Sequence, residues 1–325
     1  MYSPPRMKAM AQTSWAADAP LVLTDLPTPE PRPTELRVRV HAIGVNPVDW
    51  KMRSRGPLRL AARVLGPPPP VVFGVDFAGV VEAVGERVTD VRIGDRVVGG
   101  TDFSRKQRGS YADRVIVRPD QIAVLPDAID FKTAAALPVP GGTAWKCLVD
   151  VGHLKPGQRA LVLGASGAVG QFAVQIARHV GASAIGVCST RNIALVQSLG
   201  AEAVLDYTQG DPLVQAKAFA PYQVVLDAVG GHSGAACRAL LAPGGRHTMI
   251  AAEGPLENMN ILAPPFTSKS VLGRPTAAIL RSLVAAVASG AITVRIAETM
   301  PLTDAERALE LSRGGRLTGK LILLP

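Results

Sequence analysis

The alternation of apolar and polar residues changes part-way along this chain. Up to about residue 125, short segments alternate the two kinds of residue or end an apolar run at glycine, as in ELRVRVHAIGV (35–45), FAGVVEAVG (77–85) and IGDRVVGG (93–100). A period of two residues is typical of half-buried β-strands, and glycine commonly ends such runs. The first part of the chain is therefore predicted to be rich in β-strands.

From about residue 133 onward, buried strands alternate with helices. The predicted strands are RALVL (159–163), SAIGVC (183–188), EAVLDY (202–207), YQVVLDAVG (222–230), GRHTMI (245–250) and SKSVLG (268–273). The predicted helices lie at 168–180, 192–200, 233–241 and 276–289. Strands that alternate with helices, without hairpin turns, predict right-handed crossovers and a parallel sheet. The last segment, TGKLILLP (318–325), is predicted as a strand that returns to the first domain.

Composition narrows the class of protein. The 325 residues are 47% hydrophobic, which suits a globular protein with a sizeable core. No apolar run is as long as the roughly 18 to 20 residues that span a bilayer, so no membrane is expected as a partner. The three cysteines, Cys147, Cys188 and Cys237, are far apart and odd in number, which argues against a disulfide framework. The start, MYSPPRMKAM, lacks an apolar secretion signal, and a cytoplasmic location is expected.

The chain carries 35 basic and 26 acidic residues, a formal net charge of +9. Nucleic acid is one partner that such an excess suggests. However, the sequence shows no zinc finger, no RNA-binding aromatic motif and no long basic tail, and only 4% of its residues are aromatic. Base stacking needs aromatic side chains, so an anionic small molecule is the better candidate and no nucleic acid is expected as a partner.

The segment LVLGASGAVGQ (161–171) joins the first predicted strand of the parallel sheet to its helix. Glycines stand at 164, 167 and 170, in the pattern Ala165-x-Gly167-x-x-Gly170. In this setting glycines let the backbone approach a pyrophosphate, and the helix N-terminus supplies free N–H groups. The predicted dinucleotide-binding residues here are Ser166, Gly167, Ala168, Val169 and Gly170; the alternative is a plain turn.

The end of the second strand bears on the choice of cofactor. A site for NAD commonly has an acid there to bind the ribose hydroxyls, whereas this chain has CSTRN (188–192). Ser189, Thr190 and Arg191 offer hydroxyls and a guanidinium, which suit the 2′-phosphate of NADPH, and Tyr207 follows the third strand. The prediction is NADPH, and the alternative is a solvated loop with an ordinary helix cap at Ser189 or Thr190.

An ordered set of motifs along nearly the whole chain resembles a known family. The set comprises HAIGVNPVDWKMR, FGVDFAGVVEAVG, IGDRVVG, GSYADRVIV, AAALPVPGGTAW, VLGASGAVGQFAVQIA, SLGAEAVLDY, LDAVGG and GKLIL. Together they are similar to the zinc-independent, quinone-oxidoreductase-like branch of the medium-chain dehydrogenase/reductase superfamily. The resemblance implies an α/β protein with a GroES-like, β-rich catalytic domain (1–125 and 275–325), a Rossmann doubly wound nucleotide-binding domain (126–274), and an active site in the cleft.

The zinc-dependent alcohol dehydrogenases of this superfamily carry metal ligands at three places in these motifs. This chain has Asn46-Pro47-Val48-Asp49 at the first place, Gly74-Val75-Asp76 at the second and Pro140-Gly141-Gly142 at the third. The four-cysteine structural zinc lobe is also missing. A catalytic zinc needs about three protein ligands, so no metal is expected, and alcohol oxidation by metal polarisation is not expected either.

The resemblance then implies hydride transfer from NADPH to the C=C bond of an α,β-unsaturated carbonyl. Asn46 and Asp49 match the family's N-x-x-D segment at the nicotinamide end, where Asp49 either orients Lys51 or Arg53 or relays a proton; the alternative is a polar turn. The other residues that the resemblance assigns to the site are Thr143, Val229, Gly230, Arg274 and Lys320. Thr143 has a helix N-cap as its alternative role, and Arg274 a surface position.

The proton donor is left open among Lys51, Asp49 and water, because none of the four tyrosines stands where some family members have theirs; Tyr111 is expected to be structural. A second open question is the basic run WKMRSRGPLRLAAR (50–63), which is followed by SRKQR (104–108). The run makes Arg53, Arg55 and Arg59 candidates for binding the phosphates of an acyl-CoA. The alternative is a solvated face.

The sequence thus predicts an NADPH-dependent, metal-independent reductase of an enoyl thioester, enone or quinone. The competing prediction is a non-catalytic NADPH-binding protein, since some members of the family serve as lens crystallins or bind RNA. A homodimer is expected from the resemblance alone.

Overall fold

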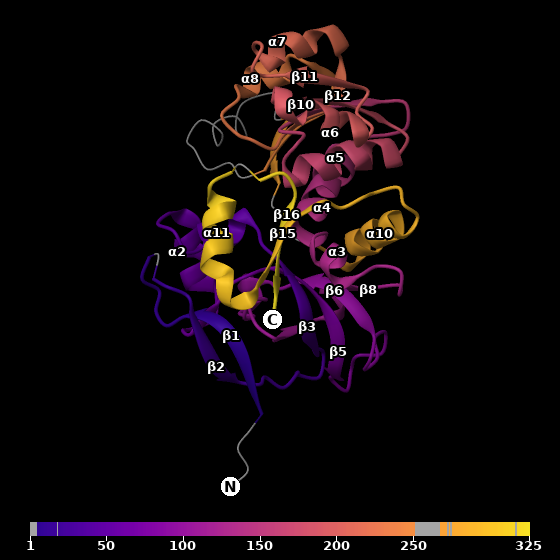
Figure 1. The fold of residues 1–325 in the computed structure, drawn as a ribbon. Helices are drawn as coiled ribbons and strands as arrows, with labels where there is room; N and C mark the ends of the chain where they lie inside the picture. Colours follow the sequence, from indigo (N-terminus) through magenta and orange to yellow (C-terminus); the bar gives the residue numbers. More distant parts are fainter. Residues whose placement is uncertain (1–4, 18, 251–266, 272, 274, 316) are drawn as a thin grey trace. The chain divides into compact units, whose positions relative to one another are not determined.

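The structure, a computed structural model, describes residues 5–17, 19–250, 267–271, 273, 275–315 and 317–325. The chain forms two compact units (Figure 1). The first unit contains Met1–Val139, Arg274–Ala288 and Thr293–Pro325, and the second contains Pro140–Gly273 and Ser289–Ile292. The domain limits expected from the sequence, at 125/126 and 274/275, remain predictions.

The first unit is rich in β-strands, as predicted. Its three-stranded sheet has the order β2-β1-β4, and its larger sheet has the order β15-β16-β3-β5-β6-β8, with β7 paired to β3 (Figure 1). The strands are β1 (Arg6–Gln12), β2 (Val22–Pro27), β3 (Leu36–Gly44), β4 (Val71–Val72), β5 (Asp76–Val84), β6 (Arg96–Gly100), β7 (Arg114–Val117), β8 (Ile122–Val124), β15 (Ile296–Pro301) and β16 (Lys320–Leu324). The C-terminal strand β16 pairs with β3, so the chain does return to its first unit.

The alternation along β3 explains its place in the sheet. Leu36, Val38 and Val40 are buried, whereas Arg37 and Arg39 between them are more exposed. Successive side chains of a strand point to opposite faces, so one face of β3 lies in the core and the other presents charge. The core side includes fully buried Phe73 and Phe77.

Helices also occur in the first unit, of which only α10 was expected, as the helix predicted at 276–289. They are α1 (Pro47–Lys51), α2 (Pro57–Leu65), α3 (Phe131–Ala135), α10 (Ala277–Ala288) and α11 (Ala305–Arg313), with short 3₁₀ turns η1 (Phe103–Arg105), η2 (Pro119–Gln121) and η6 (Leu302–Asp304). Pro47 and Pro57 open α1 and α2. Proline's fixed φ suits the first helical position, and this signal in the basic run was missed.

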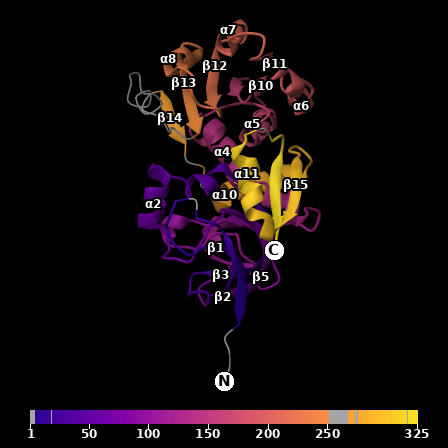
Figure 2. The same ribbon diagram turned by 60° about the vertical axis from the view of Figure 1, so that its left-hand side comes forward.

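The second unit holds a six-stranded sheet in which every pair of neighbours is parallel, as predicted. The strand order is β11-β10-β9-β12-β13-β14, and β14 lies beside β13 at one edge (Figure 2). Numbered along the chain this is 3-2-1-4-5-6, the order of dinucleotide-binding sheets. The strands are β9 (Arg159–Leu163), β10 (Ser183–Cys188), β11 (Ala203–Asp206), β12 (Tyr222–Asp227), β13 (Leu241–Ile250) and β14 (Ser268–Val271).

The helices of the second unit follow its strands. They are α5 (Ala168–His179), α6 (Ile193–Ser198), α7 (Pro212–Ala216) and α8 (Gly234–Arg238), with the π-helical turn η3 (Lys146–Asp150) and the 3₁₀ turns η4 (Thr190–Asn192) and η5 (Lys217–Phe219). Helix α4 (Pro138–Trp145) contains the end of the first unit's first segment. The helix predicted at 233–241 is too long: α8 ends at Arg238, because Leu241 pairs with Tyr222 and begins β13.

Truncating the core of the second unit should lower its stability. Leu161 is fully buried in β9, which has β10 on one side and β12 on the other. Replacing a buried leucine by alanine loses transfer free energy and leaves a cavity, so Leu161→Ala should reduce the free energy of unfolding by about 2–5 kcal/mol in urea titrations. Leu23 is 51% exposed in β2, and Leu23→Ala is the control, with a change within about 0.5 kcal/mol. Equal losses in both variants would contradict the assignment of Leu161 to the core.

Candidate functional site

The turn between β9 and α5 is shaped by its glycines. Gly164 has a φ of +83°, which favours glycine. A Cβ added at Gly170 would lie 2.2 Å from the backbone oxygen of Gly164, so the turn closes only without a side chain there. At Gly167, by contrast, an added Cβ would meet only that same oxygen, at 3.3 Å. The turn is therefore tight behind Gly170 and open at Gly167.

This turn fits a pyrophosphate. Helix α5 begins at Ala168 and has no side-chain cap. The first backbone bond of the helix runs from the N–H of Gln171 to the oxygen of Gly167, and among the described residues the N–H groups of Ala168, Val169 and Gly170 have no backbone acceptor. Free N–H groups and the positive end of the helix dipole attract phosphate oxygens. The predicted residues Gly167 to Gly170 thus lie together at the uncapped start of α5, with backbone N–H groups suited to holding a pyrophosphate.

Ser166, also predicted to bind the cofactor, accepts hydrogen bonds from two neighbouring side chains. Its hydroxyl accepts a hydrogen bond from the Asn192 side chain at 3.1 Å, and its carbonyl accepts one from the Gln171 side chain at 2.8 Å. Ser166 therefore ties the glycine turn to the loop after β10.

Beside the loop after β10 lies an acid, Asp206 of β11, that the sequence analysis did not expect. Thr190 donates its hydroxyl to Asp206 Oδ2 at 2.5 Å, because Asp206 ends the neighbouring strand β11, beside Cys188 of β10. Hydrogen bonds from Thr190 and Thr208 hold the pKa of Asp206 below its usual value, so this carboxylate is ionised at neutral pH. The end of the second strand has no acid, and the acid comes from the end of the third, directly before Tyr207, where the sequence analysis named only the tyrosine.

The other residues predicted for the 2′-phosphate lie nearby in the chain. Arg191 is exposed in η4, and Tyr207 is 55% exposed directly after β11. Among the described residues, the Arg191 guanidinium makes no ion pair, while the hydroxyl of Ser189 accepts from Asn192 at 3.4 Å. The loop therefore offers one uncompensated cation and one carboxylate.

The loop after β12 is held by Asp227 rather than left open. Asp227 accepts from the backbone N–H groups of Val229, at 3.0 Å, and Gly230, at 2.8 Å, and pairs with His232 Nδ1 at 3.0 Å. Although burial opposes it, these bonds lower the pKa of Asp227, and the carboxylate raises the pKa of His232. The backbone N–H groups of Val229 and Gly230, two residues predicted to bind the cofactor, are thus already bonded. Val229 still presents a 67% exposed side chain.

Thr143 lies inside α4 rather than at its N-cap, and it is buried. A Cβ at Gly273 would overlap its hydroxyl at 1.8 Å, so Gly273 is what allows these two segments to meet. Arg274 lies outside the described residues.

The first unit gathers Asn46, Asp49, Asp76, Tyr111 and Lys320 into one buried cluster. The Asn46 side chain donates to Asp76 Oδ2 at 2.9 Å, and the Lys320 ammonium donates to Asn46 Oδ1 and, at 3.2 Å, to Asp76 Oδ2. Asp49 accepts from the backbone N–H of Asn46 at 2.8 Å and from the hydroxyl of Tyr111 at 3.0 Å. Sequence reasoning named Asn46, Asp49 and Lys320, but it missed Asp76 and Tyr111 as members.

Three paired strands bring the cluster together. Gly44 at the end of β3 pairs with Asp76 of β5 and with Ile322 of β16, two residues after Lys320. A Cβ on Gly44 would lie 2.2 Å from the oxygen of Ala135 and 3.0 Å from the side chains of both Asp76 and Lys320. Because residue 44 has no side chain, the side chains of Asp76 and Lys320 can lie directly against β3 at this point.

The cluster contains two carboxyls and one ammonium. Burial raises the pKa of Asp76 and lowers that of Lys320, and the opposite charge of each partner counteracts the shift. Burial, with the nearby Asp76, raises the pKa of Asp49 to about 7. Asp49 Oδ1 is also buried without a hydrogen-bond partner among the described residues. Because one ammonium balances one carboxylate, the second carboxyl retains its proton close to neutral pH.

Asp49 does not orient Lys51 or Arg53. The Arg53 guanidinium is 7% exposed and makes a bidentate pair with Glu306, at 2.7 and 2.9 Å, and a bond to the backbone oxygen of Ala19. Glu306 of α11, far along the chain, thus already binds this guanidinium, and the role of Arg53 as a phosphate ligand stays a prediction that the pairing disfavours. Lys51 lies over the Trp50 ring at 5.4 Å.

The rest of the basic run is divided between the surface and a backbone contact. Arg55 and Arg63 are exposed, whereas Arg59 is half-buried and donates to the backbone oxygen of Trp15. In the second basic run, Arg105 forms a bidentate pair with Asp120 at 2.8 and 2.9 Å. The basic segments are thus not one uniform solvated face.

Two further observations concern metal and membrane. Within the described parts of the chain, no three His, Cys, Asp or Glu side chains gather in a group suited to a metal ion. In the same residues, no helix combines the length and the apolar character needed to cross a membrane.

Comparison with known proteins shows the family to which the chain belongs. Residues 32–127 match the model of the alcohol dehydrogenase GroES-like domain, and residues 199–323 match that of the zinc-binding dehydrogenase. The chain is 32% identical to the quinone oxidoreductase of Sus scrofa over 318 residues, which are 93% of this chain and 92% of that protein. It belongs to the quinone-oxidoreductase-like branch of the medium-chain dehydrogenase/reductase superfamily.

Other relatives agree with the assignment. The structure of the quinone oxidoreductase from Coxiella burnetii superimposes with a TM-score of 0.88 at 29% identity and covers 99% of this chain and 100% of that one. A 213-residue stretch is 36% identical to the Mus musculus protein "NAD(P)H oxidoreductase RTN4IP1, mitochondrial", covering 61% of this chain and 53% of that protein. The family is one of NAD(P)H-dependent oxidoreductases, with the GroES-like and Rossmann domains predicted from the sequence.

The pKa of Asp49 makes stability depend on pH. The folded value of about 7 lies above the ordinary 3.8, so this group's contribution to stability is complete below about pH 4 and is lost as the pH rises through 7. Asp49→Asn lacks this titration. The free energy of unfolding of the wild type, measured in urea relative to that of Asp49→Asn, should therefore fall between pH 5 and 8 by at least about 1.4 kcal/mol, the equivalent of one pKa unit.

The control is Asp90→Asn, at an exposed acid of the same unit. Its difference from the wild type should stay flat over the same pH range. A flat difference for Asp49→Asn as well would show that the Asp49 carboxyl titrates at its ordinary value.

Proposed function

We propose that this protein is an NADPH-dependent reductase that reduces a C=C bond conjugated to a carbonyl, as in an enone, a quinone or an enoyl thioester. The observation that carries the proposal is the buried group of two carboxyls and one ammonium. Such a reduction adds a hydride and a proton to the substrate. Bound NADPH supplies the hydride; the Asp49 carboxyl, with its pKa near 7, holds a proton at the pH of the cell.

Burial and the nearby Asp76 hold that proton on Asp49, against the hydrogen bonds donated by Asn46 and Tyr111, which lower its pKa. The Asn46 backbone and the Tyr111 hydroxyl bond to one oxygen of Asp49, and the other oxygen is left without a protein partner among the described residues. Lys320 and Asn46 fix Asp76 as the second acid of the cluster, and Asp76 makes ionisation of Asp49 less favourable. In this proposal Asp49 is the proton reservoir of the site.

NADPH rather than NADH is favoured by Arg191. Its guanidinium is exposed and makes no ion pair with the described residues, and guanidinium groups bind phosphate with two parallel hydrogen bonds. Asp206 favours NADH, because a carboxylate repels a 2′-phosphate and accepts hydrogen bonds from ribose hydroxyls. However, both oxygens of Asp206 already accept hydroxyl bonds, from Thr190 and Thr208.

For the acceptor, an acyl-CoA remains one candidate beside quinones and simple enones. Arg55 and Arg63 are the exposed members of the first basic run, and Arg55 carries this part of the proposal now that Arg53 is paired with Glu306. The relatives from Sus scrofa and Coxiella burnetii are both named quinone oxidoreductases, which supports a quinone as the acceptor.

The cofactor preference is tested by titration. NADPH should bind at least about tenfold more tightly than NADH, which corresponds to about 1.4 kcal/mol. Arg191→Ala should weaken NADPH binding and leave NADH binding nearly unchanged, whereas Asp206→Asn should shift the ratio toward NADPH. Equal affinities of the wild type for the two cofactors would contradict the preference.

The reaction is tested by following NADPH oxidation with quinones, enones and short enoyl-CoA esters. At least one acceptor should be turned over, and kcat should fall as the pH rises above about 7, where Asp49 loses its proton. Asp49→Asn should lower kcat by about 100-fold or more and abolish this pH dependence, with the Kd for NADPH kept.

Asp90→Asn is again the control and should behave like the wild type. If NADPH binds but no acceptor is reduced, the non-catalytic alternative is correct. If turnover persists in Asp49→Asn with an unchanged pH profile, Asp49 is not the proton reservoir. For an enoyl-CoA acceptor, Arg55→Ala should raise KM with kcat nearly kept, as expected for contacts away from the reacting atoms.

A further inference from the structure

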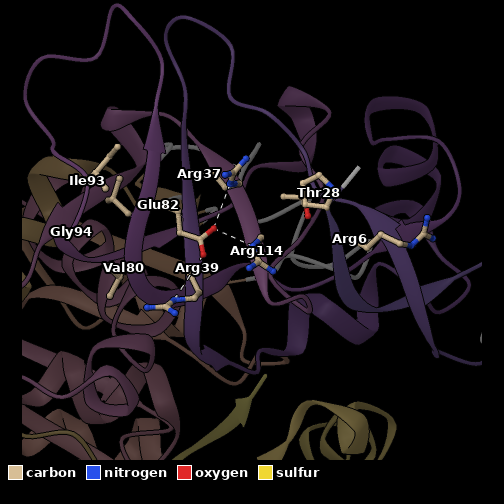
Figure 3. Close-up of a pocket in the computed structure, with 11 residues that line it drawn as sticks. Arg6, Thr28, Arg37, Arg39, Val80, Glu82, Ile93, Gly94 and Arg114 are labelled. Carbon is tan, nitrogen blue, oxygen red and sulfur yellow. Dashed lines mark hydrogen bonds and ion pairs between the residues drawn. The ribbon is translucent and has the colours of Figure 1, made fainter. Parts of the chain in front are cut away.

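We propose that a hollow on the charged face of the larger sheet in the first unit binds a small multivalent anion. The hollow has a volume of about 530 Å³, which is within the roughly 300–1,000 Å³ of small-molecule sites. Figure 3 shows its lining, in which Arg37, Arg39 and Arg114 surround one acid, Glu82, while the side chain of the fourth arginine, Arg6, extends away from them. None of its lining residues belongs to the buried cluster of Asn46 and Lys320.

The arginines meet because of strand register. Arg37 and Arg39 are two residues apart on β3 and so share its outer face. Arg39 pairs directly with Arg114 of β7, and β5 on the other side of β3 presents Glu82. Strand pairing therefore places several cations around one carboxylate, on elements that the sheet holds rigid.

Glu82, the acid of the lining, lies at unequal distances from the three arginines around it. Glu82 contacts Arg114 at 3.1 Å, Arg37 at 3.4 Å and Arg39 only at 3.9 Å (Figure 3). Arg37 also pairs with Glu30 and Arg114 with Asp113, outside the lining. Arg39 is 55% exposed and has no hydrogen bond among the described residues beyond strand pairing. A ligand anion would supply the missing charge at Arg39.

Arg6 and Thr28 line another part of the hollow. The only side-chain bond of Arg6 to the described residues runs to the backbone oxygen of Asp25, at 2.6 Å, and involves no carboxylate. The hydroxyl of Thr28 is buried without a partner among the described residues, although Thr28 lines the hollow. This hydroxyl is shielded from solvent, so the guanidinium groups are the donors that a ligand in the hollow would reach.

The lining also indicates the class of ligand. Guanidinium groups match the planar or forked oxygens of carboxylates and phosphates, and three of them, those of Arg37, Arg39 and Arg114, lie around one acid. Val80 and the 66% exposed Ile93 supply the apolar wall of the hollow. The fitting ligand is a small molecule with two or more phosphate or carboxylate groups.

The test uses the full-length protein saturated with NADP⁺, so that the glycine turn of the second unit does not compete for phosphate. Inorganic pyrophosphate and citrate are titrated separately at low salt, with calorimetry and with the NMR amide signals of Ile93 and Gly94 as readouts. Arg39→Gln should raise the Kd by about tenfold, as expected for loss of a charge-assisted bond. Arg281→Gln, at an exposed arginine of α10, is the matched control and should leave the Kd unchanged.

Binding of pyrophosphate alone assigns the hollow to phosphate compounds, and binding of citrate alone assigns it to polycarboxylates. Binding of both supports a general site for multivalent anions. The proposal is overturned if neither probe shifts the signals of Ile93 and Gly94 at millimolar concentration, or if Arg39→Gln binds as tightly as the wild type. Response to a polyglutamate peptide alone would also overturn it, in favour of a protein partner.

Discussion

The buried charges of the first unit impose the constraint on which its candidate chemistry depends. Asp49, Asp76 and Lys320 are almost completely removed from solvent, and such groups are tolerated only when they pair and bond to one another. The packing provides this through Gly44, which has no side chain to keep the strands' charged groups apart. With two carboxyls and one ammonium, one proton has to remain, and Asp49 retains it near neutral pH.

Positive charge is used in different ways in different parts of the first unit. Arg53 forms a partly buried ion pair with Glu306. This pair joins the segment after α1 to α11. Arg55 and Arg63, by contrast, are exposed on the surface. Arg37, Arg39 and Arg114 crowd around a single carboxylate on a rigid sheet. Net charge alone therefore says little about binding, because the partner of each guanidinium decides whether it is available to a ligand.

The second unit separates two requirements of nucleotide recognition. The glycine turn and the uncapped N-terminus of α5 serve the pyrophosphate that both nicotinamide cofactors share. The loop after β10 addresses the group in which they differ, with Arg191 and Asp206 exerting opposite electrostatic effects. Selectivity on such a loop depends on a balance of two charges rather than on the presence of one.

The sequence by itself determined the class of fold, the parallel order of strands and helices, the glycine turn and the membership of the family. These features follow from local patterns: the period of apolar residues sets the element, and glycine at 164 and 170 reflects a local backbone requirement. Only the tertiary structure decided that Asp206 stands beside Thr190, that Asp76 and Tyr111 join Asn46, and that Glu306 takes Arg53. The partners in these contacts are 16 to 253 residues apart in the chain, and strand pairing and helix packing bring them together. The charge and the pKa of a side chain depend on such neighbours. Folding therefore decided which ionisable groups are already paired within the protein and which can bind a ligand.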